Sequence, residues 1–182
     1  EAHPATLGAF NMTPEAQSIY DSCDLMLVVG SRLRGNETKN NKMALPSPLI
    51  QIDVDPSQAG RNYPVDAFLC GDATQVLRGL LDRLPDRLET DPQLAYDIAV
   101  ARAKSEGALR ARLGPYQIVA DHLLSAVPAG EHPWVRDVTI ANSTFGNRYV
   151  QIAAPHLGVH ALGGGIGQGV AMAVGAAVAS AN

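Results

Sequence analysis

The stretch Asp24-Leu-Met-Leu-Val-Val-Gly30 decides the fold class of this 182-residue chain. It is a continuous apolar run that ends in glycine, a pattern typical of a strand buried on both faces of a parallel sheet. Pro48-Leu-Ile-Gln-Ile-Asp-Val-Asp55 shows the same pattern, and Ala67-Phe-Leu-Cys-Gly-Asp72 predicts a shorter strand. Because about three strands are visible where a sheet usually has about five to six, we expect the domain to begin partway through its sheet.

Helices are predicted on either side of these strands. Thr13 as N-cap and Pro14 at the first helical position predict a short helix that ends at residue 22. Residues 73–84 carry apolar side chains at positions 76, 77, 80, 81 and 84, which is the stripe of an amphipathic helix. Strands that alternate with helices predict right-handed crossovers and an α/β fold with a doubly wound parallel sheet.

A change in composition after residue 84, from alternating apolar segments to a charged segment, predicts a second domain. Prolines bracket a charged segment, and we expect a solvated linker helix over residues 93–113. Beyond it the pattern predicts a helix over 116–127, a strand over 135–140 and a helix over 144–153. Glycines at positions 163, 164, 165, 167 and 169 then precede a helix of small residues. Without β-carbons in that turn, consecutive N–H groups can converge on an anion at the positive end of the helix.

The composition argues against several classes of function. A net charge of −4 and a pI near 5.7 leave no basic surface, so neither nucleic acid nor an acidic membrane is expected as a partner. His160, Gln168 and their neighbouring glycines favour packing within a protein over a membrane span. Cys23 and Cys70 lack the spacing of zinc or redox motifs, and the five histidines lack metal-ligand spacing. Without a basic and apolar leader segment, we expect a cytoplasmic location.

Six motifs occur in the order and spacing of a known family. They are His3-Pro4-x-x-Leu-Gly8, Asp24-Leu-Met-Leu-Val-Val-Gly-Ser-Arg32, Ile50-Gln-Ile-Asp-Val-Asp-Pro56, Arg61-Asn62, Gly71-Asp72-Ala73 and Gly164-Gly-Ile-Gly-Gln-Gly169. Together they resemble the thiamine-diphosphate-dependent enzymes of the acetolactate synthase and benzoylformate decarboxylase group. The resemblance runs through nearly the whole chain.

The resemblance implies a three-domain enzyme of which this chain is a fragment. Residues 1–84 would be the central Rossmann-like (DHS-like) domain without its first strand, residues 85–115 an interdomain linker helix, and residues 116–182 the truncated first part of the α/β thiamine-diphosphate-binding domain. The family's catalytic glutamate and Mg²⁺ ligands lie outside the matched motifs. No catalytic or metal-binding residue is therefore assigned to this chain, and we expect the fragment alone to be inactive.

The resemblance also assigns thiamine-diphosphate contacts. Gly165, Ile166 and Gly167 would line the cofactor, with the branched Ile166 side chain wedged beneath the bend between its two rings. Ser143 and Thr144 match a segment whose hydroxyl and backbone groups contact the diphosphate. The bland alternatives stay open at this point: Ile166 could be a core residue before a buried helix, and either hydroxyl could be a plain N-cap.

A nucleotide site is implied in the central domain. Arg32 after the first strand, with Asp53 and Asp55 at the end of the next, matches the place where acetolactate synthases bind FAD and oxalyl-CoA decarboxylases bind ADP. However, Leu33-Arg34-Gly35 replaces the Phe-Asp-Asp-Arg continuation of the FAD-binding members. Loop capping by Asp53 and Asp55 is the alternative, so FAD stays open.

The sequence is compatible with several functions. The leading one is decarboxylation of a 2-keto acid such as pyruvate followed by carboligation, as in acetolactate synthase. The alternatives are decarboxylation without carboligation, as in benzoylformate or oxalyl-CoA decarboxylases, a noncatalytic adenine-nucleotide-binding module, and a structural oligomerisation domain. The resemblance implies thiamine diphosphate and Mg²⁺ as cofactors and a homodimer or homotetramer for the intact enzyme.

Overall fold

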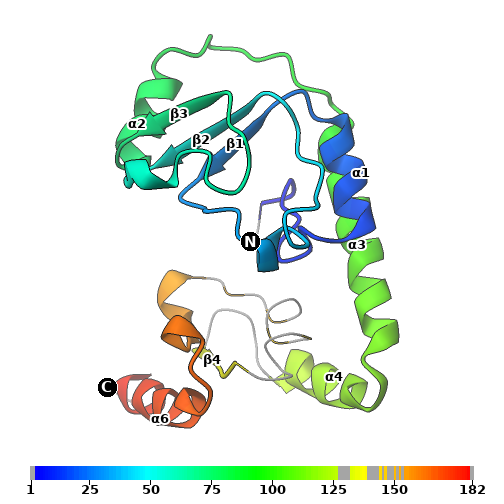
Figure 1. Cartoon of the computed structure of the whole chain (residues 1–182). Coiled ribbons are helices and arrows are strands. Elements are labelled where there is room, and N and C mark those ends of the chain that lie inside the picture. The colour runs from blue at the N-terminus through cyan, green and yellow to red at the C-terminus, as the bar shows by residue number, and fades with distance from the viewer. Residues whose placement is uncertain are drawn as a thin grey trace. The chain divides into compact units, whose positions relative to one another are not determined.

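The computed structural model describes residues 3–126, 132–138 and 154–180, together with the single residues 144, 146, 150 and 152. The chain divides into two compact units (Figure 1). The central unit is Asn11–Ala101, and the C-terminal unit combines residues 1–10 with residues 102–182. The domain boundaries expected at residues 84 and 115 stay a prediction.

The central unit is built on a parallel sheet. Its strands are β1 (Met26–Val29), β2 (Leu49–Asp53) and β3 (Ala67–Cys70), hydrogen-bonded in the order β1-β2-β3. In the register of the sheet, Leu27 lies opposite Ile50, which in turn lies opposite Ala67. All three strands fall within the stretches predicted from the sequence, and the α/β fold class is confirmed.

The two α-helices that lie wholly within the central unit begin at side-chain caps. The hydroxyl of Thr13 accepts a hydrogen bond from the Ala16 N–H at 3.2 Å, at the start of α1 (Pro14–Ser22). The carboxylate of Asp72 accepts one from the Gln75 N–H at 3.1 Å, at the start of α2 (Ala73–Leu81). Both caps satisfy amide groups that a helix leaves without partners in its first turn. The α1 prediction is confirmed, whereas α2 ends three residues before the expected residue 84.

The expected burial of the first strand on both faces is wrong. Val28 is 6% exposed, but Leu27 and Val29 on the opposite face are each 38% exposed. In β2, by contrast, Leu49 and Ile52 are almost fully buried. A continuous apolar run shows that a strand can be covered on both sides, but burial also needs a second layer. The described residues leave one face of β1 open.

The C-terminal unit begins with two helices around a small core. The helices are α3 (Leu94–Arg112), which starts in the central unit, and α4 (Gln117–Ala126), joined by a 3₁₀ turn over Gly114–Tyr116. Phe10, Leu109, Leu113 and Ala120 pack together as a buried cluster. The charged helix over residues 93–113 was predicted to be solvated, and this is wrong for one stripe of it. Along α3 this stripe is buried: Ile98, Ala101, Ser105 and Leu109.

A parallel strand pair and a helix complete this unit. β4 (Trp134–Arg136) pairs with β5 (Gly158–His160), and α6 (Gln168–Ser180) follows β5 through the glycine cluster. β4 overlaps the predicted strand at 135–140, whose end lies outside the described residues. β5 was missed, because three residues are too few to show a periodic pattern. The helix expected over 144–153 falls largely outside the described residues, and no helix among those described has the length and apolar character needed to cross a membrane.

Candidate functional site

The glycine cluster forms a tight turn between β5 and α6. Three of its glycines have positive φ angles: 67° at Gly163, 76° at Gly164 and 93° at Gly167. These are left-handed conformations that residues with a β-carbon rarely adopt. The turn therefore depends on glycine at these positions for its backbone path, before any ligand is considered.

The N–H groups of this turn converge on a carboxylate of the chain itself. Oδ2 of Asp137 accepts hydrogen bonds from the Gly167 N–H at 2.9 Å and from the Gly169 N–H at 3.0 Å. Oδ1 of the same side chain accepts one from the Val138 N–H at 2.7 Å. The expectation that these amides can gather around an anion thus agrees with the geometry. The anion they hold in this structure is an aspartate and not a phosphate.

The sequence reasoning missed Asp137. It lies directly after β4, thirty or more residues before its two glycine partners. Hydrogen bonds from those N–H groups lower the pKa of its carboxyl, with the bond from Gly169 the largest cause and desolvation opposing it. A carboxylate at the positive end of α6 is also favoured by the helix dipole. The only signal in the sequence was a lone acidic residue inside the strand predicted over 135–140.

Ile166 lies at the exposed tip of the glycine turn. Its side chain is 78% exposed, so it is not a core residue of the described chain. It also heads an apolar stripe at helical spacing along α6, in which Val170, Val174 and Val178 are 61–76% exposed. A branched side chain held in the open between two glycines is sterically suited to support a ligand from one side. The structure therefore leaves Ile166 free to contact a cofactor.

Of the two hydroxyl residues expected at the diphosphate, the structure describes one. Ser143 lies outside the described residues. Thr144 is described as part of a turn and is half-buried. Its neighbour Gly146 accepts a hydrogen bond from Nε1 of Trp134 at 2.8 Å, which ties this segment to the start of β4. A contact of Ser143 or Thr144 with a diphosphate stays a prediction.

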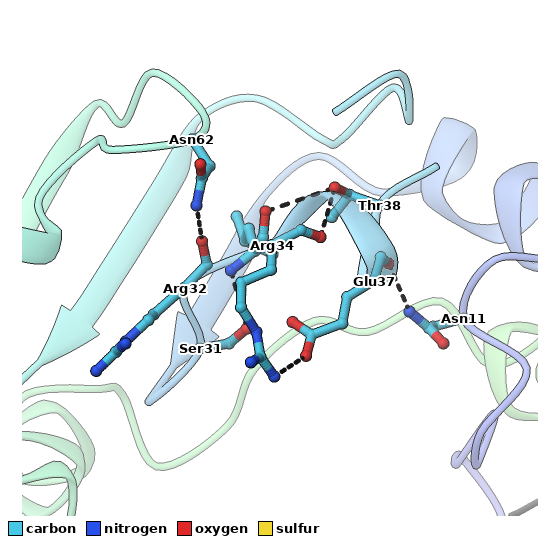
Figure 2. A network of polar contacts seen from close by, with 8 residues as sticks. Asn11, Ser31, Arg32, Arg34, Glu37, Thr38 and Asn62 are labelled. Atoms are coloured by element: carbon cyan, nitrogen blue, oxygen red, sulfur yellow. Dashed lines mark hydrogen bonds and ion pairs between the residues drawn. The ribbon is translucent and has the colours of Figure 1, made fainter. Parts of the chain in front are cut away.

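A second candidate site lies where β1 ends (Figure 2). Gly30, Ser31, Arg32, Arg34 and Glu37 line a pocket of about 250 Å³ there. Nη2 of Arg34 pairs with Oε1 of Glu37 at 2.6 Å. Figure 2 shows the guanidinium of Arg32 pointing away from that pair. The Arg32 carbonyl is held by Nδ2 of Asn62, which donates to it at 2.6 Å.

A buried glutamine side chain in the middle of β2 holds this loop by a hydrogen bond. Gln51 is 3% exposed, and its Nε2 donates to the Ser31 carbonyl at 3.3 Å. Its Oε1 accepts from the Gly60 N–H at 3.2 Å. Because both ends of the amide are bonded, Gln51 can lie in the core without an unpaired polar atom. It fixes the loop that carries Arg32 relative to the sheet, a role that the apolar strand pattern did not reveal.

Asp53 and Asp55 make loop-capping hydrogen bonds. Oδ1 of Asp53 accepts from the Asp55 N–H at 2.9 Å. Asp55 in turn accepts from the Ser57 N–H at 2.9 Å and from Nε2 of Gln58 at 2.7 Å. The hydrogen bond from Gln58, those from Ser57 and the charge of Arg32 together lower the pKa of Asp55 to about 2. The structure thus brings Arg32 near Asp55, and it gives both carboxylates the structural role that the sequence left as the alternative.

Comparison with known proteins finds a family match in the first part of the chain. Residues 1–80 match the family described as "Thiamine pyrophosphate enzyme, central domain". A three-stranded parallel sheet with flanking helices in this region agrees with that match. The resemblance stated from the six motifs is confirmed.

One relative extends the similarity to nearly the whole chain, and others match about half of it. A Pseudomonas aeruginosa protein named "Probable 2-ketoarginine decarboxylase" is 28% identical over 174 residues, which are 95% of this chain and 31% of that protein. The acetolactate synthase large subunit of Haemophilus influenzae is 34% identical over 100 residues, half of this chain and 18% of that protein. A Methanocaldococcus jannaschii protein named "Probable acetolactate synthase large subunit" is 36% identical over 87 residues, 46% of this chain and 15% of that protein. The chain thus spans about a third or less of the length of these relatives.

Proposed function

We propose that the protein carrying this chain is a thiamine-diphosphate-dependent enzyme that decarboxylates a 2-keto acid. The match of residues 1–80 to the central domain of such enzymes carries the proposal. The similarity to a protein named as a 2-ketoarginine decarboxylase supports it, because it covers 95% of this chain. When bound, thiamine diphosphate stabilises the negative charge left on the substrate carbon as carbon dioxide departs.

The glycine turn is the part of the chain that we propose to meet the cofactor. Gly165, Ile166 and Gly167 would line the cofactor, and Ile166 would support the bend between its two rings. There is room beside Gly167, where nothing lies within 4 Å of a β-carbon built on the backbone, whereas the side chain of Gln168 fills that space beside Gly165. The 78% exposure of Ile166 supports this role, because a side chain already buried in the core could not take it. We place Ser143 and Thr144 at the diphosphate.

The diphosphate and its metal require groups beyond this turn. The N–H groups of Gly167 and Gly169 are engaged with Asp137, so they are not available to phosphate oxygens in this conformation. Among the residues that the structure describes, no three histidine, cysteine or acidic side chains come together as metal ligands. As the family resemblance implies, we propose that Mg²⁺ is held by residues outside this chain.

The product class separates two forms of the proposal. Acetolactate-synthase-like chemistry joins the decarboxylated substrate to a second keto acid, whereas a simple decarboxylase protonates it and releases an aldehyde. Pyruvate and 2-ketoarginine are the first substrates to test on the natural-length protein, with carbon dioxide and the organic product measured together. Release of an aldehyde supports the simple decarboxylase, and acetolactate supports carboligation. No carbon dioxide from any 2-keto acid in a broad panel would refute the proposal.

An adenine nucleotide at the end of β1 is a second candidate function. The observation that favours it is the guanidinium of Arg32. It makes no hydrogen bond or ion pair with the residues that the structure describes, and it borders a pocket of about 250 Å³. That volume suits a phosphate or a ribose and not the whole of FAD. Titration with FAD and with ADP shows which of these nucleotides binds. If neither binds, the pocket is not a nucleotide site.

We also propose a cytoplasmic homodimer or homotetramer for the natural-length protein. The net charge of −4 supports a partner other than nucleic acid or an anionic membrane. Sedimentation of the natural-length protein tests the assembly, and a monomer at micromolar concentration would contradict it.

A further inference from the structure

Asp137 joins two segments that lie far apart in the sequence. Its Oδ1 accepts from Val138 on its own strand segment, and its Oδ2 accepts from Gly167 and Gly169, where α6 begins. One side chain therefore connects the end of β4 to both the last residue of the glycine turn and the first turn of α6. Ile166 directly precedes Gly167, so the carboxylate anchors the backbone one residue away from it.

The residues around Asp137 are fitted to this contact. A β-carbon at position 169 would lie 2.8 Å from Cβ of Asp137 and 3.1 Å from its Oδ2, closer than side chains pack. Position 167 has a φ of 93°, which directs its N–H toward the carboxylate without the strain that a side chain would add. Glycine at 167 and 169 is thus explained by the aspartate as well as by any cofactor.

The turn needs such an anchor because it is rich in glycine. Glycine loses more conformational freedom on folding than any other residue, so a turn with glycines at 163, 164, 165 and 167 is ordered at a high entropic cost. Hydrogen bonds to a charged acceptor are stronger than those between neutral groups. Two such bonds on one carboxylate oxygen restrict the turn on the side where Ile166 projects.

We propose that Asp137 is a positioning residue that fixes the glycine turn and so presents Ile166 to the cofactor without touching the cofactor itself. This inference rests on the proposed thiamine-diphosphate function. Asp137 also determines how the site is used, since it occupies the N–H groups that would otherwise attract the diphosphate. In this proposal the turn contacts the rings of the cofactor through the apolar side chain of Ile166, and residues other than Gly167 and Gly169 bind its diphosphate.

The test uses the natural-length protein with Asp137→Ala and the nearly isosteric Asp137→Asn. The control is Asp72→Ala, which removes a carboxylate that caps the start of α2 and lies outside the turn. Hydrogen exchange at the Gly167 and Gly169 amides, measured without cofactor, reports on the anchor directly. We expect exchange there to accelerate about five- to tenfold in Asp137→Ala and less in Asp137→Asn, and to be unchanged in Asp72→Ala.

Steady-state kinetics then distinguish a positioning role of Asp137 from a role in stability alone. Asp137→Ala should lower kcat about tenfold or more while KM for the keto acid changes by less than about threefold, because substrate contacts are kept. Unchanged exchange at the two glycines would overturn the anchor, and faster exchange with unchanged kcat would overturn the positioning role. Unchanged exchange of α4 amides, which belong to the same unit as Asp137, excludes unfolding of that unit as the cause.

Failure of the proposed function gives a different pattern. If the wild-type protein neither binds thiamine diphosphate nor needs it, the exchange result still measures the anchor, but the positioning role falls with the function. If the wild-type protein binds and uses the cofactor and Asp137→Ala behaves like wild type in both measurements, only the inference about Asp137 fails.

Discussion

Replacing Gly169 with alanine tests the contact between the start of α6 and Asp137. The added β-carbon would lie 2.8 Å from Cβ and 3.2 Å from Cγ of Asp137, so the aspartate must move away by several tenths of an ångström. Overpacking of this kind costs about 1–3 kcal/mol. Alanine also favours the helix over glycine by about 0.5–1 kcal/mol, which offsets part of that cost.

Gly175→Ala in the same helix is the matched control. Nothing lies within 4 Å of a β-carbon built at Gly175, so only the helix-propensity gain applies there. Gly169 lies in the first turn of α6, so its propensity gain is no larger than that at Gly175, and the difference between the two variants reports mainly the overpacking. Gly169→Ala should therefore be less stable than Gly175→Ala by about 1–3 kcal/mol.

Native-state hydrogen exchange of α6 amides is the appropriate assay, because it reports local opening in a chain with two units. We expect Gly175→Ala to slow exchange slightly and Gly169→Ala to accelerate it. Equal or greater protection in Gly169→Ala would show that Asp137 does not approach α6 as closely as the structure places it, and would refute the reasoning.

Three further predictions address the two candidate sites. Ile166→Ala should lower kcat about 10- to 100-fold and change the Kd for thiamine diphosphate by less, because a small geometric error at the reacting centre is costly; steady-state kinetics with a cofactor titration checks this, and a larger effect on Kd than on kcat would contradict it. Because the pKa of Asp55 is lowered to about 2 by its hydrogen bonds, its stabilising effect is present above about pH 4 and is lost as pH falls toward 2. The stability difference between wild type and Asp55→Asn should shrink over that range in acid unfolding, and a difference independent of pH would argue against the loop cap. Arg32→Ala should weaken ADP or FAD binding about tenfold where Arg78→Ala on α2 does not, as measured by calorimetry; equal affinities in both variants would remove the pocket from consideration.

The parts of the fold that depend on local pattern were predictable from the sequence. The apolar runs gave the three strands of the central unit, and Thr13 with Pro14 gave the start of α1. These features follow from neighbouring residues, so the chain itself carries their signal. β5 was not predictable, because its three residues carry no period and its partner strand lies more than twenty residues earlier.

The candidate site was predictable only where its residue types are unusual. The glycine cluster and Ile166 stand out in the sequence, and the structure places Ile166 at an exposed turn. Asp137 acts through backbone N–H groups, which every residue except proline has, so the sequence does not show which amides it meets. The exposed faces of β1 and α6 could not be predicted either, because burial depends on which layers cover an element.

The dependence of decarboxylation on thiamine diphosphate tests the central claim most directly. The natural-length protein is stripped of cofactor and divalent metal, and carbon dioxide release from pyruvate and from 2-ketoarginine is followed before and after each is returned. We predict that activity on the preferred keto acid disappears on stripping and returns only when thiamine diphosphate and Mg²⁺ are both added. Undiminished activity in the stripped protein would contradict the account.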